Sequence, residues 1–260
     1  MSKLFRRMRR RIGVDRPAPL GDRGYLICSS PRSGSSYLCE LLASTGVLGV
    51  PREYLNVADR WGQVDGKPPA DPRALLDRVL TAGATPNGIY ALKAHADHFA
   101  AVAAVVDPLR ALPNLRFVSI RRRDILAQAI SWLRAGQSLQ FRATDRQRGV
   151  PTYDASAIRG YLAMLAEQRA AWNRMFAATG CAPLAIEYER LMQEPQRDVD
   201  RVAQFVGVAL PASIVPALVT ITIQRDDLNA EWQRRFLEET GDEFRYLAAS
   251  VTSSSPPISA

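Results

Sequence analysis

Residues 24–36 constrain the fold of this chain most, because they predict a buried strand, a tight loop and a helix in direct succession. Gly24 to Cys28 form a short apolar run, which is typical of a buried parallel strand. The next eight residues, Ser-Ser-Pro-Arg-Ser-Gly-Ser-Ser at 29–36, are rich in small hydroxyl side chains. From Ser35 onward apolar residues recur at helical spacing, so a helix begins there.

The composition of the loop at 29–36 suits an anionic ligand. Glycine and small hydroxyl residues let a backbone close around a phosphate, and a helix N-terminus offers it unpaired N–H groups. Arg32 adds a fixed cation with paired donors. The loop is not a Walker A motif, because Ser29 replaces its first glycine and Ser35 replaces its lysine. This difference disfavours a magnesium-dependent kinase.

The rest of the chain alternates between strand and helix patterns. Further strands are predicted at 89–93, 115–120 and 183–188, and further helices at 74–80, 99–109, 124–135, 158–178, 195–206 and 229–239. Such alternation predicts an α/β fold with a parallel sheet flanked by helices. We expect one domain at 22–249, between a basic N-terminal tail (1–21) and a C-terminal tail (250–260).

The net charge of +8 lies mostly in the N-terminal tail, where residues 1–12 carry six basic and no acidic side chains. The nearly neutral remainder disfavours nucleic acid as a partner. The tail lacks the apolar stretch of a signal peptide. It is interpreted as a solvated terminus, with peripheral membrane contact through residues 1–12 as the alternative.

The three cysteines, Cys28, Cys39 and Cys181, are scattered and form no CxxC pair. This pattern argues against a disulfide framework or a zinc site and favours a reducing compartment. No stretch approaches 18 consecutive apolar residues, so no membrane-spanning helix is predicted. We therefore expect a cytoplasmic protein with no metal site.

The segment Pro31–Ser36 resembles the first motif of sulfotransferases that use 3′-phosphoadenylyl sulfate (PAPS), Pro-(Lys/Arg)-Ser-Gly-(Ser/Thr)-(Ser/Thr). The resemblance implies the P-loop-like sulfotransferase fold, with PAPS as co-substrate. It also implies that Arg32 holds the bridging oxygen as the sulfuryl group leaves. The residues implied to bind the 5′-phosphosulfate are Arg32, Ser33, Gly34, Ser35 and Ser36.

A second motif follows the strand predicted at 115–120. Three consecutive arginines, 121–123, precede a helix that Asp124 is placed to cap. Positive charges at a helix N-terminus interact unfavourably with the helix dipole. Three arginines at this position therefore suggest that an anion binds among them. The run Arg-Arg-x-Asp-x-x-x-Gln-Ala-x-Ser is similar to the bacterial trehalose 2-sulfotransferase-like branch. This implies that Ser131 and either Arg122 or Arg123 bind the nucleotide 3′-phosphate, and both arginines stay candidates.

Two residues compete for the role of general base toward the acceptor hydroxyl. Glu53 matches, by position, the base of the trehalose-type branch, and we expect burial to raise its pKa. Lys93-Ala94-His95 resembles the strand of the arylsulfotransferase-like branch, in which the histidine is the base. Glu53 is favoured because most of the resemblance is to the trehalose-type branch. Lys93 either contacts the sulfuryl group or pairs with Glu53.

The resemblance implies a bacterial enzyme that moves a sulfuryl group from PAPS to a hydroxyl of a carbohydrate or glycolipid, such as a trehalose-like sugar. Trp132, Arg134 and Gln137 are candidates to face the acceptor, beside a lid predicted at 134–152. The resemblance also allows a homodimer. Two alternatives stay open: a P-loop kinase that needs Mg²⁺, and a non-catalytic nucleotide-binding module of the same fold.

Overall fold

The computed structural model describes residues 21–56, 71–141, 145–221 and 227–253, so residues 1–12 lie outside the described part. The chain forms two compact units, Met1–Ile125 with Ala163–Thr222 and Leu126–Leu162 with Ile223–Ala260. The division into two compact units does not decide whether residues 22–249 form one domain, which stays a prediction. Within the described ranges, no helix has both the length and the apolar character needed to cross a bilayer.

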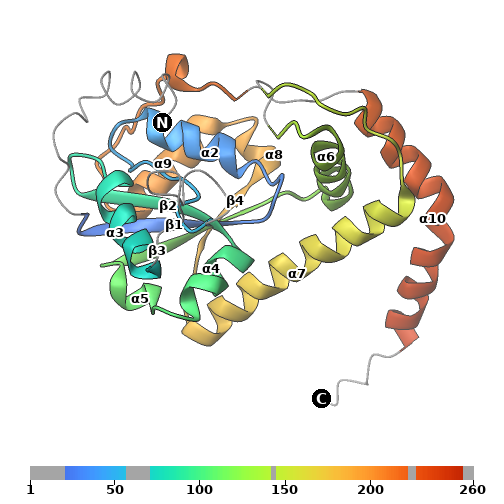
Figure 1. The fold of residues 1–260 in the computed structure, drawn as a ribbon, viewed down its shortest axis with the longest axis horizontal. Helices are drawn as coiled ribbons and strands as arrows, with labels where there is room; N and C mark the ends of the chain where they lie inside the picture. The colour runs from blue at the N-terminus through green and yellow to red at the C-terminus, as the bar shows by residue number, and fades with distance from the viewer. Residues whose placement is uncertain (1–20, 57–70, 142–144, 222–226, 254–260) are drawn as a thin grey trace. The chain divides into compact units, whose positions relative to one another are not determined.

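A four-stranded parallel sheet lies at the centre of the first unit, which confirms the predicted α/β class (Figure 1). The strands, in the spatial order β2-β1-β3-β4, are β1 (Arg23–Ser29), β2 (Ile89–His95), β3 (Leu115–Arg121) and β4 (Leu184–Glu187). In the register of β1 and β2, Ser29 lies opposite His95. Because the strands are parallel, the residues after each of them emerge at one edge of the sheet, where α/β proteins bind ligands.

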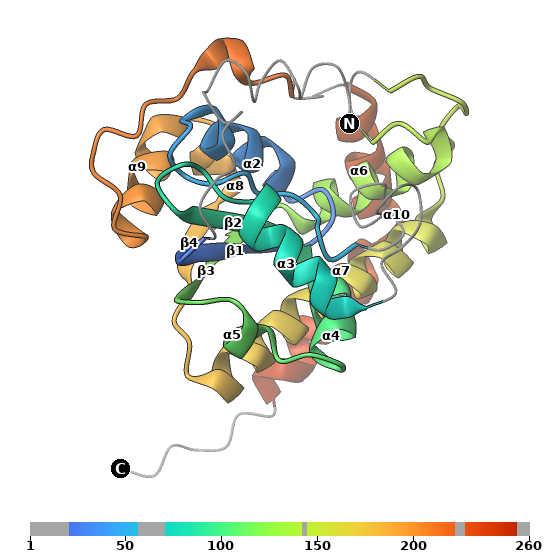
Figure 2. The same cartoon turned by 60° about the vertical axis from the view of Figure 1, so that its left-hand side comes forward.

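Helices cover both faces of this sheet. Those of the first unit are α2 (Ser35–Ser44), α3 (Pro72–Ala82), α4 (Ala96–Ala103), α5 (Pro108–Ala111), the part of α7 (Ala155–Thr179) from Ala163 onward, α8 (Tyr188–Leu191), α9 (Pro195–Phe205) and the short η1 (Pro216–Leu218). Tyr25 and Ile27 of β1 pack in one apolar layer with residues of α2 and α9. Leu26 and Cys28 pack in the other apolar layer, with residues of α3, α4 and α7. Figure 2 shows α3 and α4 on the side of the sheet opposite to α2 and α9. This alternation fixes the sheet between two buried layers.

Two predicted elements of the first unit differ from the observed ones. The single helix expected at 99–109 is divided, because Pro108 opens the new helix α5 after Asp107, whose side chain accepts a hydrogen bond from the Leu109 N–H. The strand expected at 183–188 ends at Glu187, and Tyr188 begins α8.

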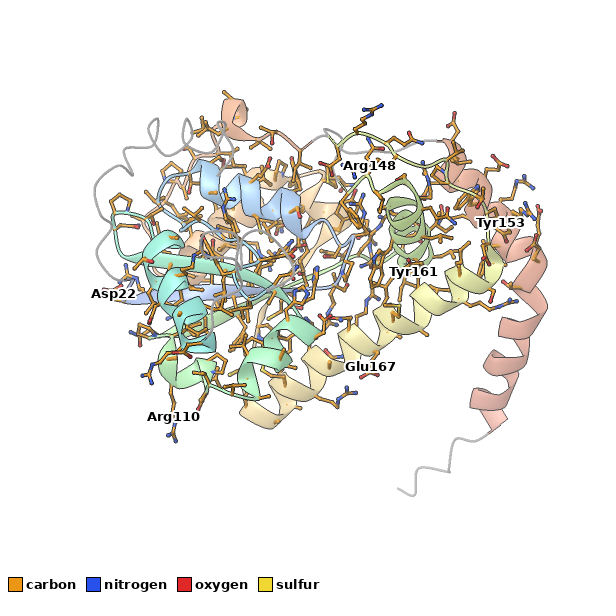
Figure 3. All side chains as sticks on the ribbon, viewed as in Figure 1. Asp22, Arg110, Arg148, Tyr153, Tyr161 and Glu167 are labelled. Carbon is orange, nitrogen blue, oxygen red and sulfur yellow. The ribbon has the colours of Figure 1, made fainter. Side chains whose placement is uncertain are left out.

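The second unit contains the part of α6 (Ile125–Ser138) after its first residue, the beginning of α7 and the helix α10 (Asp227–Ser253). Tyr153, which precedes α7 (Figure 3), packs edge-on against Trp232 of α10, with ring centroids 5.8 Å apart. The segment 134–152, predicted to be irregular, is helical as far as Ser138, because α6 continues to that residue. Its role as a lid stays a prediction. The first residues of the predicted C-terminal tail (250–260) are helical, since α10 extends to Ser253, and residues 254–260 lie outside the described part.

Candidate active site

The loop between β1 and α2 turns sharply before the helix. Arg32 and Gly34 both have positive φ angles, 61° and 84°. Gly34 is the N-cap of α2 and has no side chain to cap it, so the first-turn N–H groups receive no such partner. A side chain at this position is excluded, because a Cβ would lie 2.3 Å from Cδ2 of Tyr188. The loop thus leads into a helix whose positive N-terminal end has no capping side chain from its N-cap residue.

The hydroxyl of Ser33 points to the kind of ligand this loop takes. Ser33 is fully buried, and its Oγ has no hydrogen-bond partner among the described residues. A buried polar group without a partner costs about 1–3 kcal/mol, so such groups are rare without a functional reason. Ser35, the first residue of α2, is also buried. Buried hydroxyls beside helix N–H groups fit the oxygens of a phosphate or sulfate group.

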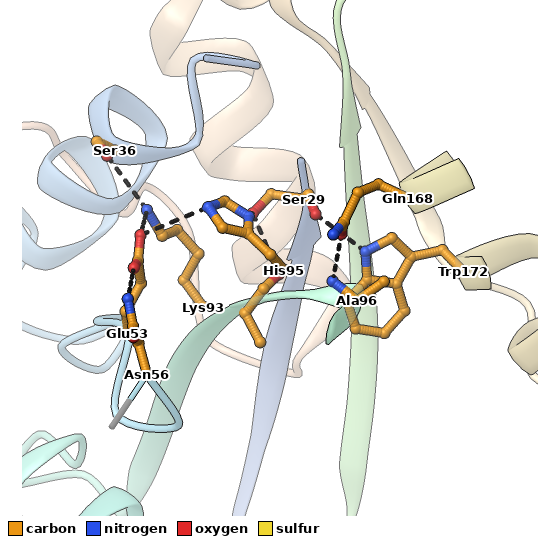
Figure 4. Close-up of polar contacts among 10 residues, drawn as sticks. Ser29, Ser36, Glu53, Asn56, Lys93, His95, Ala96, Gln168 and Trp172 are labelled. Carbon is orange, nitrogen blue, oxygen red and sulfur yellow. Dashed lines mark hydrogen bonds and ion pairs between the residues drawn. The ribbon is translucent and has the colours of Figure 1, made fainter. Parts of the chain in front are cut away.

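Lys93, near the end of β2, connects this loop to Glu53 (Figure 4). Its Nζ lies 2.5 Å from Glu53 Oε1 and donates a hydrogen bond to Ser36 Oγ at 3.2 Å. The amide of Asn56 donates to the other carboxylate oxygen, Oε2, at 3.0 Å. The Lys93 and Glu53 side chains are only 7% and 19% exposed. Of the two roles expected for Lys93, pairing with Glu53 is therefore the one present in this structure.

The pKa of Glu53 moves in the direction opposite to our expectation. Burial alone would raise the pKa, but the charge of Lys93, the proximity of His95 and the hydrogen bonds from Lys93 and Asn56 outweigh it. Together they lower the pKa of Glu53 to about 2. The expectation of a raised pKa was wrong, because it counted burial and omitted the paired ammonium. Glu53 is thus a carboxylate throughout the neutral range.

His95, the other candidate base, is directed at the same carboxylate oxygen. Its Nε2 lies 3.8 Å from Glu53 Oε1, and its Nδ1 lies 3.1 Å from Ser29 Oγ. Burial, reinforced by the charge of Lys93, lowers the pKa of His95 to about 4, so the ring is neutral at pH 7. The structure therefore brings the two rival bases, Lys93 and the loop residue Ser36 into one group.

Arg122 is connected to the loop through an aromatic ring. Its guanidinium carbon lies 5.0 Å from the ring centroid of Tyr188, the residue that abuts Gly34. Its Nε is buried and has no hydrogen-bond partner among the described residues. The backbone carbonyl of Arg122 accepts a hydrogen bond from Arg169 Nη2 at 2.6 Å. Arg122 is thus a fixed cation with an unused buried donor.

Arg123 has different surroundings. Its Nε lies 2.5 Å from Glu187 Oε1, and its backbone N–H donates to Glu189 Oε1 at 3.1 Å. Its side chain is 70% exposed. Carboxylates therefore already balance the charge of Arg123. Arg122 is thus the stronger candidate to bind an anionic ligand.

The remaining predicted residues lie on α6, in the second unit. They are Ser131, Trp132, Arg134 and Gln137. The Trp132 ring packs against Tyr161 of α7 (Figure 3), with centroids 4.8 Å apart. The side-chain amide of Gln137 holds both backbone groups of Thr152, donating to its carbonyl and accepting from its N–H. Within this unit, Gln137 thus fastens the segment that leads into α7.

Sequence reasoning missed the parts played by two residues. Tyr188 was seen only as part of a strand end, and nothing in its sequence context indicates the contact with Gly34. Ser29 was noted only as a replacement for the Walker A glycine. A signal for Ser29 did exist, because two parallel strands that end together place their last residues, Ser29 and His95, side by side.

This chain matches a family model, two curated proteins and a solved structure. The family model described as Stf0 sulphotransferase matches residues 24–239. A trehalose 2-sulfotransferase of Mycobacterium tuberculosis is 29% identical over 84% of this chain and 95% of its own length. Another, from Mycolicibacterium smegmatis, is 28% identical over 82% of this chain and 93% of its own length. Among solved structures, the sulfotransferase domain of the Synechococcus PCC 7002 olefin synthase matches with a TM-score of 0.43 and 18% identity, covering 85% of this chain and 96% of that domain.

Proposed function

This chain belongs to the Stf0 sulphotransferase family, and from that premise we propose that it transfers the sulfuryl group of PAPS to a sugar hydroxyl, releasing adenosine 3′,5′-bisphosphate. Two relatives carry the name trehalose 2-sulfotransferase, so trehalose, alone or within a glycolipid, is the first acceptor to test. Both relatives are mycobacterial proteins, which is in keeping with a bacterial enzyme. The homodimer and the membrane contact of the tail stay predictions.

The observation that carries this proposal is the buried hydroxyl of Ser33, which has no hydrogen-bond partner within the described ranges and lies just before α2, a helix whose N-cap glycine has no capping side chain. A tetrahedral anion placed there would receive hydrogen bonds from Ser33, Ser35 and the helix N–H groups. In our proposal Arg32 lies on the bridging oxygen between the phosphate and the sulfuryl group. There it stabilises the negative charge that develops as the S–O bond breaks.

We assign the 3′-phosphate of the nucleotide to Arg122 rather than to Arg123. Arg122 has a buried Nε donor without a partner among the described residues, and Tyr188 connects it to Gly34 of the loop. The carboxylates of Glu187 and Glu189 already bind Arg123. An arginine suits this task, because its planar donors match two phosphate oxygens at once. Ser131 on α6 stays a proposed second ligand.

Glu53 is the proposed first acceptor of the proton from the sugar hydroxyl. As the hydroxyl oxygen attacks sulfur, the O–H bond breaks and its proton moves to the Glu53 carboxylate. The bond from sulfur to the bridging oxygen breaks in line, and its electron pair stays on the leaving bisphosphate. Lys93, between Glu53 and Ser36, supplies a positive charge beside the sulfuryl oxygens. No covalent enzyme intermediate is needed.

The test is transfer from PAPS labelled in its sulfuryl group, in EDTA, to trehalose and to a panel of mono- and disaccharides. We expect labelled sugar and an equal amount of adenosine 3′,5′-bisphosphate, and loss of both in the variant Arg32→Ala. Label on none of the sugars would overturn the proposed acceptor class. The assay also separates the two alternatives, because a kinase transfers phosphate from ATP with Mg²⁺ and a binding module shows no turnover.

A further inference from the structure

The two candidate bases share one carboxylate oxygen, and a third residue orients one of them (Figure 4). His95 Nε2 lies 3.8 Å from Glu53 Oε1, while Nδ1, on the other side of the ring, lies 3.1 Å from Ser29 Oγ. Ser29 is almost completely buried at the end of β1, and its carbonyl accepts a hydrogen bond from Trp172 Nε1 at 3.0 Å. Ser29 is therefore held firmly beside the ring.

The hydrogen bonds of Ser29 determine which nitrogen of His95 carries the proton. A hydroxyl has a single hydrogen, and Ser29 Oγ donates it to the carbonyl of Ala94 at 3.2 Å, a group that can only accept. Toward His95, Ser29 Oγ must then be the acceptor, so Nδ1 carries the hydrogen and donates it. In the neutral ring Nε2 is left with a lone pair, and this lone pair faces Glu53.

From this geometry we infer that Ser29, His95 and Glu53 form a proton relay, in which His95 Nε2 receives the proton that Glu53 takes from the acceptor hydroxyl. The inference rests on the proposed sulfuryl transfer. The proton leaves the sugar oxygen, binds Glu53 Oε1 and moves to Nε2, and the imidazolium later releases it to water. Ser29 is a positioning residue, because it fixes the tautomer and touches no reacting atom.

The gap of 3.8 Å between the two acceptors fits this sequence of events. A carboxylate oxygen and a nitrogen lone pair do not attract each other, so no hydrogen bond forms before the proton arrives. Once Glu53 is protonated, its O–H becomes a donor directed at Nε2. The ammonium of Lys93, 2.5 Å from the same oxygen, favours the ionised carboxylate and so opposes a proton that stays on Glu53 Oε1.

The charged groups around His95 have opposite effects on its pKa. Glu53 stabilises an imidazolium, whereas Lys93 and His98 oppose it, and Asp97 on α4 interacts with both histidines. The ring centroids of His95 and His98 lie 5.4 Å apart. With a pKa of about 4 for His95 and about 2 for Glu53, the ring holds a proton more strongly than the carboxylate does. The order of these two pKa values is the one that transfer of a proton from Glu53 to His95 requires.

The test is a double-mutant cycle with PAPS and trehalose as substrates, in which kcat is measured for Ser29→Ala, His95→Gln and the double variant. General base catalysis contributes about 10²–10⁴-fold, so we expect His95→Gln to lower kcat by at least about 30-fold. Ser29→Ala should lower kcat several-fold. The double variant should be no slower than His95→Gln alone, because Ser29 acts through the ring. Multiplicative losses would overturn the relay.

The variant His95→Asn separates proton transfer from a purely structural role. Its amide can still donate to Ser29 Oγ, but it has no base at the Nε2 position. We expect it to lose as much kcat as His95→Gln while its dissociation constant for adenosine 3′,5′-bisphosphate stays within about twofold of the wild type. Wild-type kcat in His95→Asn would overturn the relay. Absence of sulfuryl transfer by the wild type would instead count against the proposed function.

Discussion

Lys93 Nζ lies 2.5 Å from Glu53 Oε1, and both side chains are largely buried. This pairing keeps the Glu53 carboxylate ionised next to the loop proposed to bind the donor, because the ammonium of Lys93 opposes its protonation. Such a carboxylate is a weak but permanently available proton acceptor. Its ionisation at low pH depends on Lys93, and this dependence can be measured.

Lys93→Met should introduce a loss of activity at low pH that the wild type lacks. Without the ammonium, burial becomes the main influence on Glu53 and raises its pKa above the ordinary value. A base must be ionised to act, so kcat of the variant should fall as the pH falls from 8 to 5, whereas ionisation of Glu53 causes no such fall in the wild type. Lys93→Arg keeps the cation and is the matched control. A pH profile of the same shape in Lys93→Met and the wild type would contradict this explanation.

Arg122 and Arg123 offer neighbouring substitutions with different expected results. Arg122→Ala should weaken binding of adenosine 3′,5′-bisphosphate about 10- to 100-fold, the value of one or two charged hydrogen bonds. Arg123→Ala should change it by less than about threefold, because the carboxylates of Glu187 and Glu189 already pair with that side chain. Isothermal calorimetry on both variants decides the assignment, and a larger loss in Arg123→Ala would reverse it.

Gly34→Ala should disrupt the loop. The substitution places a Cβ 2.3 Å from Cδ2 of Tyr188 and forces alanine to a φ of 84°. Left-handed backbone and overpacking together cost about 2–4 kcal/mol. Urea unfolding should show this loss, and binding of the bisphosphate should fall with it. Gly160→Ala on α7 is the control, since no atom lies within 4 Å of its Cβ and helix propensity predicts a small gain in stability.

Asp198 should matter for stability and not for the reaction. It is fully buried on α9, and its Oδ1 lies 3.1 Å from Arg190 Nη2 and 2.6 Å from Arg201 Nη1. Asp198→Ala leaves both guanidinium groups without this partner, at a cost of about 1–3 kcal/mol in the free energy of unfolding, because both arginines are only partly buried. Arg197→Ala, which removes an exposed pair on the same helix, should leave the urea midpoint unchanged. Equal midpoints for Asp198→Ala and the wild type would refute this.

The sequence was sufficient to predict the sheet, because its strands are short apolar runs set off by loops and helices. Leu26 and Cys28 alternate with Tyr25 and Ile27 between two buried layers, the pattern expected when helices cover both faces. The ends of the helices and strands were harder to predict than the elements themselves. Pro108 divides a segment whose apolar periodicity continues across it, and Tyr188 leaves the strand although its residue type favours one.

The candidate site was predictable where a motif is local and less so where it depends on tertiary contacts. Residues 31–36 form a contiguous motif, so the sequence was sufficient to place them between a strand and a helix, where the structure has them. Their part in binding the donor stays a proposal. The pKa of Glu53 depends on Lys93, 40 positions away, and the orientation of His95 depends on Ser29, on the neighbouring strand. Spacing along the chain does not reveal such contacts, although parallel strand ends make the second one foreseeable.

The most direct test of the proposed PAPS site is calorimetric titration with adenosine 3′,5′-bisphosphate and with ATP. Both titrations are done in EDTA, on the wild type and Arg32→Ala. A PAPS-binding site predicts metal-free binding of the bisphosphate that is much tighter than that of ATP and at least about 10-fold weaker in Arg32→Ala. Failure of the bisphosphate to bind, or binding of ATP only when Mg²⁺ is added, would contradict it and favour a kinase.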